Sequence, residues 1–170
     1  MAIEVVVGPP LVTINRGDTF VLSEMDGCVT AYTDQGMYSR DTRYVSKYEI
    51  FADGERWVLQ NSGALAYYAS RTYLTNPKIT TEYNDIEAAT ISLILDRAVS
   101  DCIHEDFDIH NYSVRRVRFS LELSLRSDFA VVTSRLALWI GLSCHDLGRT
   151  RHAAAKNPQL KRCTPEIEFQ

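Results

Sequence analysis

The chain has 170 residues, and its 18 basic and 22 acidic side chains give a net charge of −4. This length corresponds to about one domain, and the apolar fraction of 45% is ordinary for a globular protein with a buried core. The acidic balance argues against nucleic acid as the main partner. No stretch approaches the roughly 20 apolar residues that a membrane-spanning helix needs.

The N-terminus and the cysteines indicate the cellular compartment. The first seven residues lack the basic region of a secretory signal peptide. The four cysteines are scattered and form no Cys-x-x-Cys pair, which disfavours both a zinc site and a disulfide framework. We therefore expect a cytoplasmic protein with reduced thiols and no cofactor.

Charge is unevenly distributed along the chain. Residues 1–130 carry 12 basic and 19 acidic side chains, whereas residues 131–170 carry 6 basic and 3 acidic ones. The change of sign coincides with the loss of strand-like alternation. We therefore predict one domain over residues 1–130, followed by a divergent, weakly structured tail over residues 131–170.

Short β-forming segments follow one another from the N-terminus. Asp26-Gly27 and Asp53-Gly54 each separate two such segments, and an Asp-Gly pair in this position predicts a hairpin because both residues tolerate positive φ. The predicted strands are Ile3–Val7, Leu11–Asn15, Thr19–Ser23, Cys28–Tyr32, Tyr44–Phe51, Arg56–Gln60, Ala64–Leu74 and Thr90–Val99.

The clearest alternation lies in Ile103–Asn111 and Arg115–Leu125, where odd positions are mainly apolar and even positions mainly polar. A period of two places one face of each strand on a core and the other in water. We predict that these two strands form an antiparallel hairpin connected by Asn111-Tyr112-Ser113. Many short strands without a long helix predict an all-β fold, an antiparallel β-sandwich of two packed sheets.

The stretch from Gly36 to Tyr48 is the main candidate site, because it places three charges directly before an aromatic, β-branched segment. Asp41 could bridge the guanidinium groups of Arg40 and Arg43, or cap local backbone amides, and so fix the loop. The loop could also contact a neighbouring domain or a sugar, since Arg side chains and tyrosines suit hydroxyl-rich ligands. Both roles can hold together. The candidate contact residues are Tyr38, Arg40, Asp41, Arg43 and Tyr44.

The polar face of Ile103–Asn111 is a second candidate, carrying His104, Asp106, Asp108 and His110. Neighbouring positions on one strand face lie roughly 6.5–7 Å apart, so all four could not share one metal ion without a bend. We favour a solvated charge ladder in which Arg116 and Arg118 pair with the two carboxylates across the strands. We expect neither a metal site nor catalysis here, and no nucleophile at Cys102.

The Gly36–Ile50 segment resembles a motif of the N-terminal domain of bacterial and archaeal-type glycogen debranching enzymes, the amylo-α-1,6-glucosidase group. The family pattern is Gly-Leu-Phe-x-Arg-Asp-Thr-Arg-x-Leu-Ser-x-Tyr-Glu-Leu, and this chain has Gly-Met-Tyr-Ser-Arg-Asp-Thr-Arg-Tyr-Val-Ser-Lys-Tyr-Glu-Ile. The resemblance covers roughly residues 11–130. Further matching pieces are Asn15–Phe20, Leu74–Pro77, His104-Glu105 with Asn111-Tyr112, and Leu121–Ala130.

This resemblance implies a β-sandwich that precedes a helical (α/α)₆ barrel, and in such enzymes the barrel carries the catalytic carboxylates. A chain of this length has no room for that barrel, so we expect no hydrolase activity from it alone. The expected partner is a catalytic (α/α)₆ barrel, supplied in trans or lost, and an α-glucan is a further candidate partner. The alternative is a stand-alone carbohydrate-binding module for α-glucans.

The resemblance ends after Ala130, where Val131-Val132-Thr133-Ser134 replaces the acidic and apolar continuation typical of the family. We hypothesise that a frameshift or truncation replaced the original sequence. The chain would then be an orphan domain with an exposed apolar face meant for the barrel, and we expect it to be poorly soluble.

Overall fold

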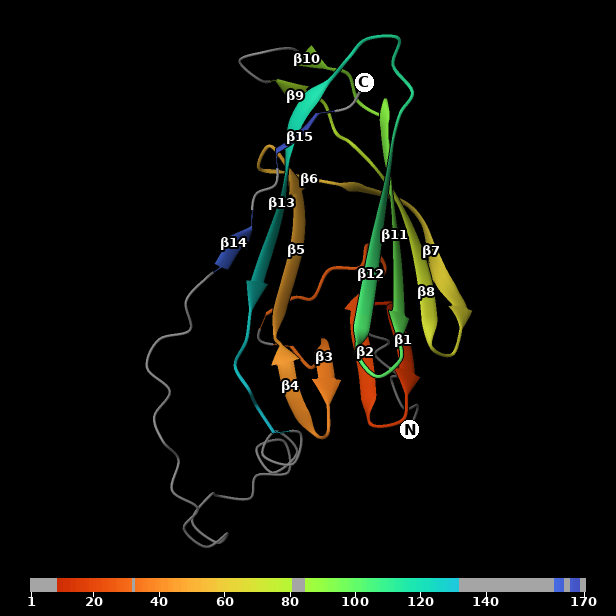
Figure 1. Cartoon of the computed structure of the whole chain (residues 1–170), viewed down its shortest axis with the longest axis vertical. Helices are drawn as coiled ribbons and strands as arrows, with labels where there is room; N and C mark the ends of the chain where they lie inside the picture. The colour runs from red at the N-terminus through yellow and green to blue at the C-terminus, as the bar shows by residue number, and fades with distance from the viewer. Residues whose placement is uncertain (1–8, 32, 81–84, 132–160, 164–165, 169–170) are drawn as a thin grey trace, which may run out of the picture.

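The computed structural model describes residues 9–31, 33–80, 85–131, 161–163 and 166–168, which contain strands and no helix (Figure 1). The strands are β1 (Leu11–Arg16), β2 (Thr19–Glu24), β3 (Gly36–Ser39), β4 (Thr42–Val45), β5 (Lys47–Ala52), β6 (Glu55–Arg56), β7 (Val58–Ala66), β8 (Ala69–Thr75), β9 (Ile79–Thr80), β10 (Asp85–Ile86), β11 (Ile91–Val99), β12 (Ile103–Asn111), β13 (Arg118–Arg126), β14 (Lys161–Cys163) and β15 (Glu166–Glu168).

These strands form an all-β sandwich, as predicted, and every described strand pair is antiparallel. One sheet has the order β1-β2-β3-β4, a second β12-β11-β8-β7 and a third β14-β13-β5-β6, while β9 and β10 form a short pair. Strand β1 contacts β7, β8 and β11, so the first sheet packs on the second. In Figure 1 the β5–β13 pair stands to the left of the β11–β12 pair, with the β1–β4 sheet below.

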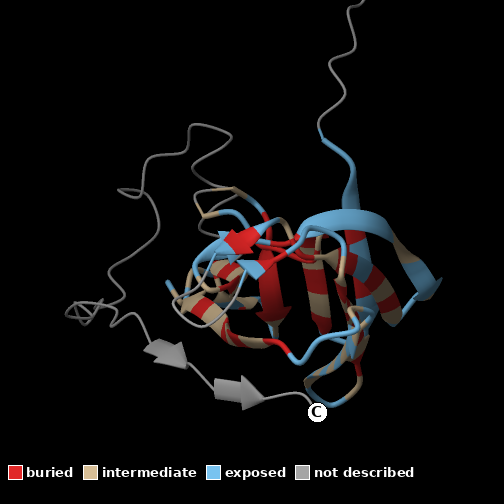
Figure 2. Cartoon of the chain, turned by 90° about the horizontal axis from the view of Figure 1, so that it is seen from above, coloured by how far each residue is buried: buried red, intermediate tan, exposed pale blue. Residues whose placement is uncertain are grey.

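The core lies between the facing strands, where Figure 2 shows buried residues in red. Strand β11 alternates strictly between buried and half-buried positions, and the predicted apolar face of Ile91, Leu93 and Leu95 is at most 1% exposed. Arg97 continues the same buried face with 2% exposure. Burying a Leu or Ile side chain stabilises a fold by roughly 1.5–3 kcal/mol, so this face is a main source of stability.

One predicted strand in the first half is wrong. Cys28–Tyr32 is not the second strand of a hairpin; among its described residues only Val29 forms a bridge, to Tyr48 of β5. Strand β2 ends in a turn in which Gly27 N donates to Glu24 O, and the chain then crosses to the third sheet. The first hairpin instead joins β1 and β2.

Two other predicted strands are each two strands. Tyr44–Phe51 divides into β4 and β5 at Ser46, whose backbone N–H and hydroxyl both donate to Arg126 O. Ala64–Leu74 contains the β7–β8 hairpin, which turns at Tyr67 and Tyr68. No Gly, Pro, Asn or Asp marks that turn, so the sequence offered no local signal for it.

The predicted hairpin of the two alternating strands is also wrong. Strand β12 pairs with β11, and β13 pairs with β5 in another sheet. The connection leaves the second sheet after Tyr112, whose N–H donates to Thr90 O. The predicted charge ladder, in which Arg116 and Arg118 pair with Asp106 and Asp108, therefore does not form between these two strands. Alternation identifies the buried face of a strand but not its neighbour.

The tail, residues 131–170, lies largely outside the described residues, so its predicted weak structure stays a prediction. The predicted strand Ile3–Val7 also lies outside them. Two short segments of it are described, and both β14 and β15 pair with β13. The described part of the chain contains no helix that is long and apolar enough to span a membrane.

Candidate functional site

The Gly36–Tyr48 stretch forms the β3–β4 hairpin and the start of β5. Arg40 and Asp41 make the turn, and both have positive φ, 48° and 62°. Such values suit a two-residue hairpin connection but are uncommon for residues other than Gly, Asn and Asp. Both turn residues are exposed, and Arg40 N donates to Asp18 O, which ties this turn to the β1–β2 turn.

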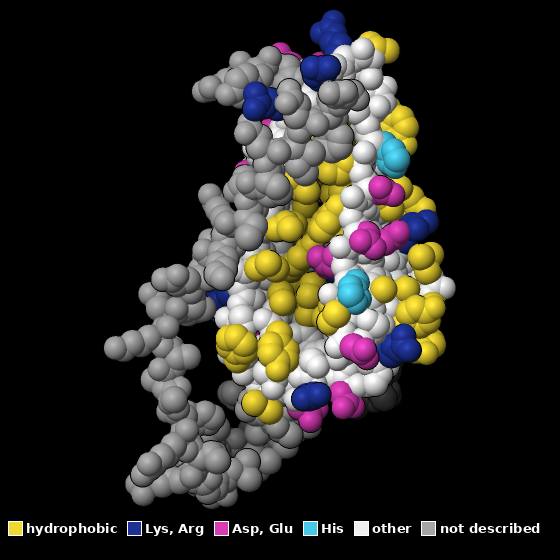
Figure 3. Space-filling model, viewed as in Figure 1, with side chains coloured by type: hydrophobic (Ala, Val, Ile, Leu, Met, Phe, Trp, Pro, Cys, Tyr) yellow, Lys and Arg dark blue, Asp and Glu magenta, His cyan; other side chains and the backbone are white. Residues whose placement is uncertain are grey.

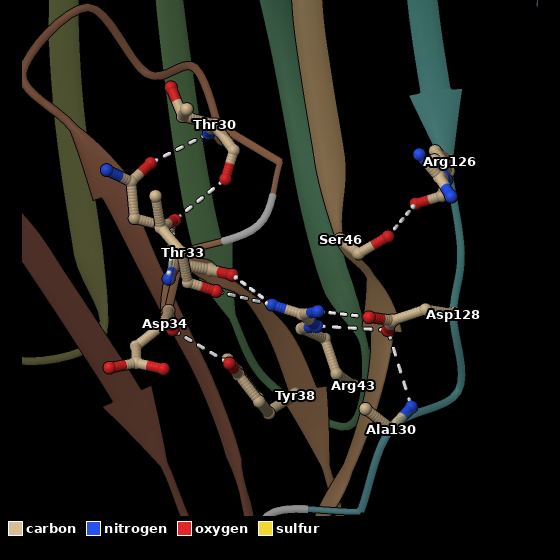
Figure 4. Close-up of polar contacts among 10 residues, drawn as sticks. Thr30, Thr33, Asp34, Tyr38, Arg43, Ser46, Arg126, Asp128 and Ala130 are labelled. Carbon is tan, nitrogen blue, oxygen red and sulfur yellow. Dashed lines mark hydrogen bonds and ion pairs between the residues drawn. The ribbon is translucent and has the colours of Figure 1, made fainter. Parts of the chain in front are cut away.

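Arg43 is the centre of the polar contacts in Figure 4. Its side chain is 3% exposed and forms a forked ion pair with Asp128, with 3.0 Å between Nε and Oδ1. Nη1 donates to the carbonyl oxygens of Thr33 (2.8 Å) and Gln35 (3.1 Å). Burial alone lowers the pKa of Arg43, but the hydrogen bond and charge of Asp128 outweigh this and raise it. The guanidinium therefore joins the β2–β3 connection to the end of β13.

The predicted bridge through Asp41 is wrong. Among the described residues Asp41 forms no ion pair with Arg40 or Arg43, and the carboxylate that pairs with Arg43 comes from Asp128, 85 residues along the chain. Sequence reasoning missed this partner because no local spacing connects the two positions. The only available signal was that Asp128 also lay in a segment resembling the same family.

Tyr38 and Tyr44 take opposite roles. Tyr38 is 4% exposed, stacks on Phe20 with 4.4 Å between ring centroids, and donates its hydroxyl to Asp34 O. Tyr44 is 50% exposed and makes an edge-on contact with Phe129, which is itself 61% exposed. Of the five candidate contact residues, Arg40, Asp41 and Tyr44 are therefore accessible to a ligand or partner, whereas Tyr38 and Arg43 are enclosed.

A groove of about 1060 Å³ opens beside this hairpin. In Figure 3 its apolar side chains form the yellow band between the β13 side and β12. The apolar lining comes from Met37, Val45, Tyr48, Ile103, Leu123 and Leu125, and charged side chains at the groove are Arg16, Asp18, Arg40, Asp101 and Glu105. Several apolar residues at this opening, including Leu123 and Leu125, are only partly buried. The sandwich is thus incompletely covered on this side.

Glu105 lies in the groove within a polar network that sequence reasoning also missed. Arg97 Nε donates to Glu105 Oε1 (2.6 Å), and Tyr48 donates its hydroxyl to Oε2 (2.7 Å). Arg97 also donates to Gly27 O (2.9 Å), and its guanidinium lies 5.1 Å from the Tyr48 ring centroid. Burial, followed by the Glu105 charge, raises the pKa of Tyr48. The network links β5, β11 and β12 to the end of the β2 turn.

The second predicted candidate, the outer face of β12, is exposed at His104, Asp106, Asp108 and His110. No group of three or more His, Cys, Asp and Glu that could hold a metal occurs among the described residues. Cys102 Sγ lies 3.1 Å from His104 Nε2, so these two side chains do meet. By contrast, burial and the Asp26 charge raise the pKa of Cys28 to about 12, which keeps that thiol protonated at neutral pH.

Gly36→Ala is expected to destabilise the domain, because an added Cβ would lie 2.6 Å from Arg43 Cδ and 2.9 Å from Val45 O. Overpacking of this kind costs roughly 1–3 kcal/mol, and the backbone oxygen cannot move aside easily. Gly63→Ala is the matched control, since a Cβ there meets nothing within 4 Å. Urea unfolding should show a lower midpoint for the first variant alone; equal midpoints would contradict the close approach at Gly36.

A comparison with known protein families identifies the family of this chain. A family described as the N-terminal domain of (some) glycogen debranching enzymes matches residues 14–134. The chain belongs to this family. The match contains the second half of β1, all of β2 to β13, the Arg43–Asp128 ion pair and the groove, so the glycogen-debranching N-terminal domain accounts for the sandwich described above. Neither the curated proteins nor the solved structures gave a match.

Proposed function

We propose that this debranching-enzyme N-terminal domain is a non-catalytic module that packs on a helical catalytic barrel through the open side of its sandwich. The single observation that carries the proposal is the partly exposed apolar lining of the groove, which continues to the exposed Tyr44–Phe129 pair. A contiguous apolar surface rimmed by polar residues is typical of a protein interface. The barrel can belong to the same polypeptide or to another.

The backbone at Phe129 supports this proposal. Its φ is 48°, in the left-handed region that a bulky residue rarely adopts, although the ring stays 61% exposed. Strain of this kind costs on the order of 1–3 kcal/mol and is usually retained where it serves a site. Ala130 N donates to Asp128 Oδ1, and Arg43 N donates to Ala130 O, so hydrogen bonds hold this backbone. Contact with a partner would bury the exposed rings of Tyr44 and Phe129.

The polar contacts of the Gly36–Tyr48 stretch support a structural rather than a catalytic role for it. The guanidinium of Arg43 and the hydroxyl of Tyr38 are engaged with neighbouring groups of the domain. Arg43 and Asp128 therefore hold the hairpin in place, and the outward-facing Tyr44 and Arg40 are left to make contacts beyond the domain. In this arrangement the chemistry of hydrolysis resides in the barrel.

The test is a binding titration of this chain with the helical barrel of a glycogen debranching enzyme, expressed separately. Tyr44→Ser and Phe129→Ser should weaken the complex at least tenfold, because aromatic residues at the centre of an interface contribute most of its affinity. Leu65→Ser is the matched control, since Leu65 is 63% exposed on β7, away from the groove lining. Equal affinity for all three variants, or no binding by the parent chain, would refute the proposal.

A second candidate function is binding of α-glucan in the same groove. Its support is the chemistry of the lining, where Tyr44 lies with Arg40, Asp18 and Asp101. Electrophoresis in a gel containing glycogen tests it. Retardation that Tyr44→Ala and Arg40→Ala abolish would support binding by the isolated chain, and equal migration with and without glycogen would leave the packing role. Both substitutions are at exposed positions, so the fold should survive them.

We also propose that a frameshift or truncation replaced the family's sequence in residues 131–170. The family match ends at residue 134, close to the predicted boundary after Ala130. Reading the DNA in all three frames from the codon for Ser127 tests it. Another frame that resumes the family sequence would support the hypothesis, and its absence in every frame would oppose it.

A further inference from the structure

Strand β7 differs in charge from β1, β6, β12 and β14, which are also outer strands of the larger sheets that the structure describes. Each of those four strands carries at least one charged side chain, whereas the two-residue edge strand β9 carries none, like β7. The nine residues Val58–Ala66 carry none. Edge strands are commonly protected from pairing by charges, proline or covering elements. Although β7 has two irregularities in its pairing with β8, it lacks the charged side chains that β1, β6, β12 and β14 carry.

The outer edge of β7 is accessible along its middle. Its residues are exposed or half-buried throughout, and the central Ser62, Gly63 and Ala64 have small side chains. The space beside the Gly63 Cα is open, with nothing within 4 Å of an ideal Cβ. Ser62 N donates to the side-chain Oδ1 of Asn61 (2.9 Å), so this amide has its acceptor within β7 itself.

Apolar and neutral groups surround this edge. Val58, Leu59, Leu65 and Tyr73 are 36–63% exposed. The charges next to them are balanced, because Arg71 forms a two-bond ion pair with Asp96 at 2.6 Å for each bond. Burial of the apolar side chains would favour association, and no like charges on β7 would oppose the pairing of two identical strands.

We propose that β7 pairs with β7 of a second copy of this chain, antiparallel and about a two-fold axis near Ser62 and Gly63. Such pairing is isologous, so it closes at a dimer and satisfies both edges at once. It would join two four-stranded sheets into one continuous sheet by main-chain hydrogen bonds. The Leu59 end of one strand would lie beside the Leu65 end of the other. The dimer is independent of barrel packing, which uses the groove.

Sedimentation velocity of the full chain over a hundredfold range of concentration tests the dimer. We expect a species of twice 19.3 kDa at the upper end. Gly63→Glu should shift the dissociation constant at least tenfold towards monomer, because it places like charges near the two-fold axis. Val114→Glu adds the same charge at a fully exposed residue outside β7 and should leave dimerisation unchanged. A monomer at every concentration, or equal effects of both variants, would overturn the proposal.

Amide hydrogen exchange of the unaltered chain locates the interface without relying on variants. At concentrations that populate the dimer, amides of Val58–Ala66 should exchange more slowly than in the monomer. Protection of Tyr44 and Leu123–Leu125 in place of β7 would assign the dimer to the groove and overturn the pairing. Because the barrel titration uses the groove, failure of that experiment would leave the dimer result unaffected.

Discussion

Arg43→Met is expected to lower the free energy of unfolding by about 3–5 kcal/mol, the range measured when one partner of a buried ion pair is removed. The substitution leaves the carbonyl oxygens of Thr33 and Gln35 without their donor and leaves Asp128 unpaired. The Asp128 side chain is 33% exposed, so water will solvate it in part and the lower end of the range applies. Urea unfolding monitored by circular dichroism measures the loss.

Two further variants separate charge from geometry at this position. Arg43→Lys should restore little, since an ammonium group cannot make the forked pair with Asp128 and still reach the opposite carbonyls. Asp128→Asn should cost less than Arg43→Met, because it leaves the guanidinium with its two carbonyl acceptors. If Arg43→Met changes the free energy of unfolding by less than about 1 kcal/mol, as for a surface pair, the structural role of Arg43 is wrong.

Arg97→Met is expected to be similarly destabilising, by about 3 kcal/mol or more, because it leaves the partly buried Glu105 without its cationic partner. Arg97 is 2% exposed, and its loss also removes the donor to Gly27 O. Chemical denaturation of the variant measures the effect. Unlike a core Leu, this residue links three strands to a turn through polar contacts.

Arg71→Met provides the matched control for Arg97→Met. Arg71 also pairs with a carboxylate across neighbouring strands, but its side chain is 38% exposed. Solvent-exposed ion pairs contribute little to stability, so the free energy of unfolding of this variant should be close to that of the parent chain. If both variants lower the free energy of unfolding by the same amount, burial does not explain the contribution of the Arg97 network to stability.

Much of the fold could be predicted because local patterns carry the necessary physics. Alternation along β11 identified its buried face, and Asp53-Gly54 identified the β5–β6 turn. The predictions that failed concern which strands pair with one another, and this depends on contacts between distant parts of the chain. Nothing in the alternation of β12 and β13 says that they belong to different sheets, and the turn at Tyr67-Tyr68 has no local marker.

The candidate site was predicted in position but only partly in mechanism. The charge density of the Gly36–Tyr48 stretch pointed to a fixed loop, and the structure fixes it through Arg43. The choice of Asp128 over Asp41 could not be read locally, because it depends on the end of β13 returning beside β4. Arg97 was likewise hidden, since an Arg in a β-strand is more often solvated than buried.

Amide hydrogen exchange of this chain with and without a separately expressed debranching-enzyme barrel tests the central proposal most directly. Packing through the open side predicts slower exchange at Tyr44, Val45 and Leu123–Leu125 when the barrel is bound. Amides at the far end of β12, from Asp108 to Asn111, do not line the groove and should exchange at an unchanged rate. Protection confined to that end of β12, or no protection at a saturating barrel concentration, would contradict docking through the groove.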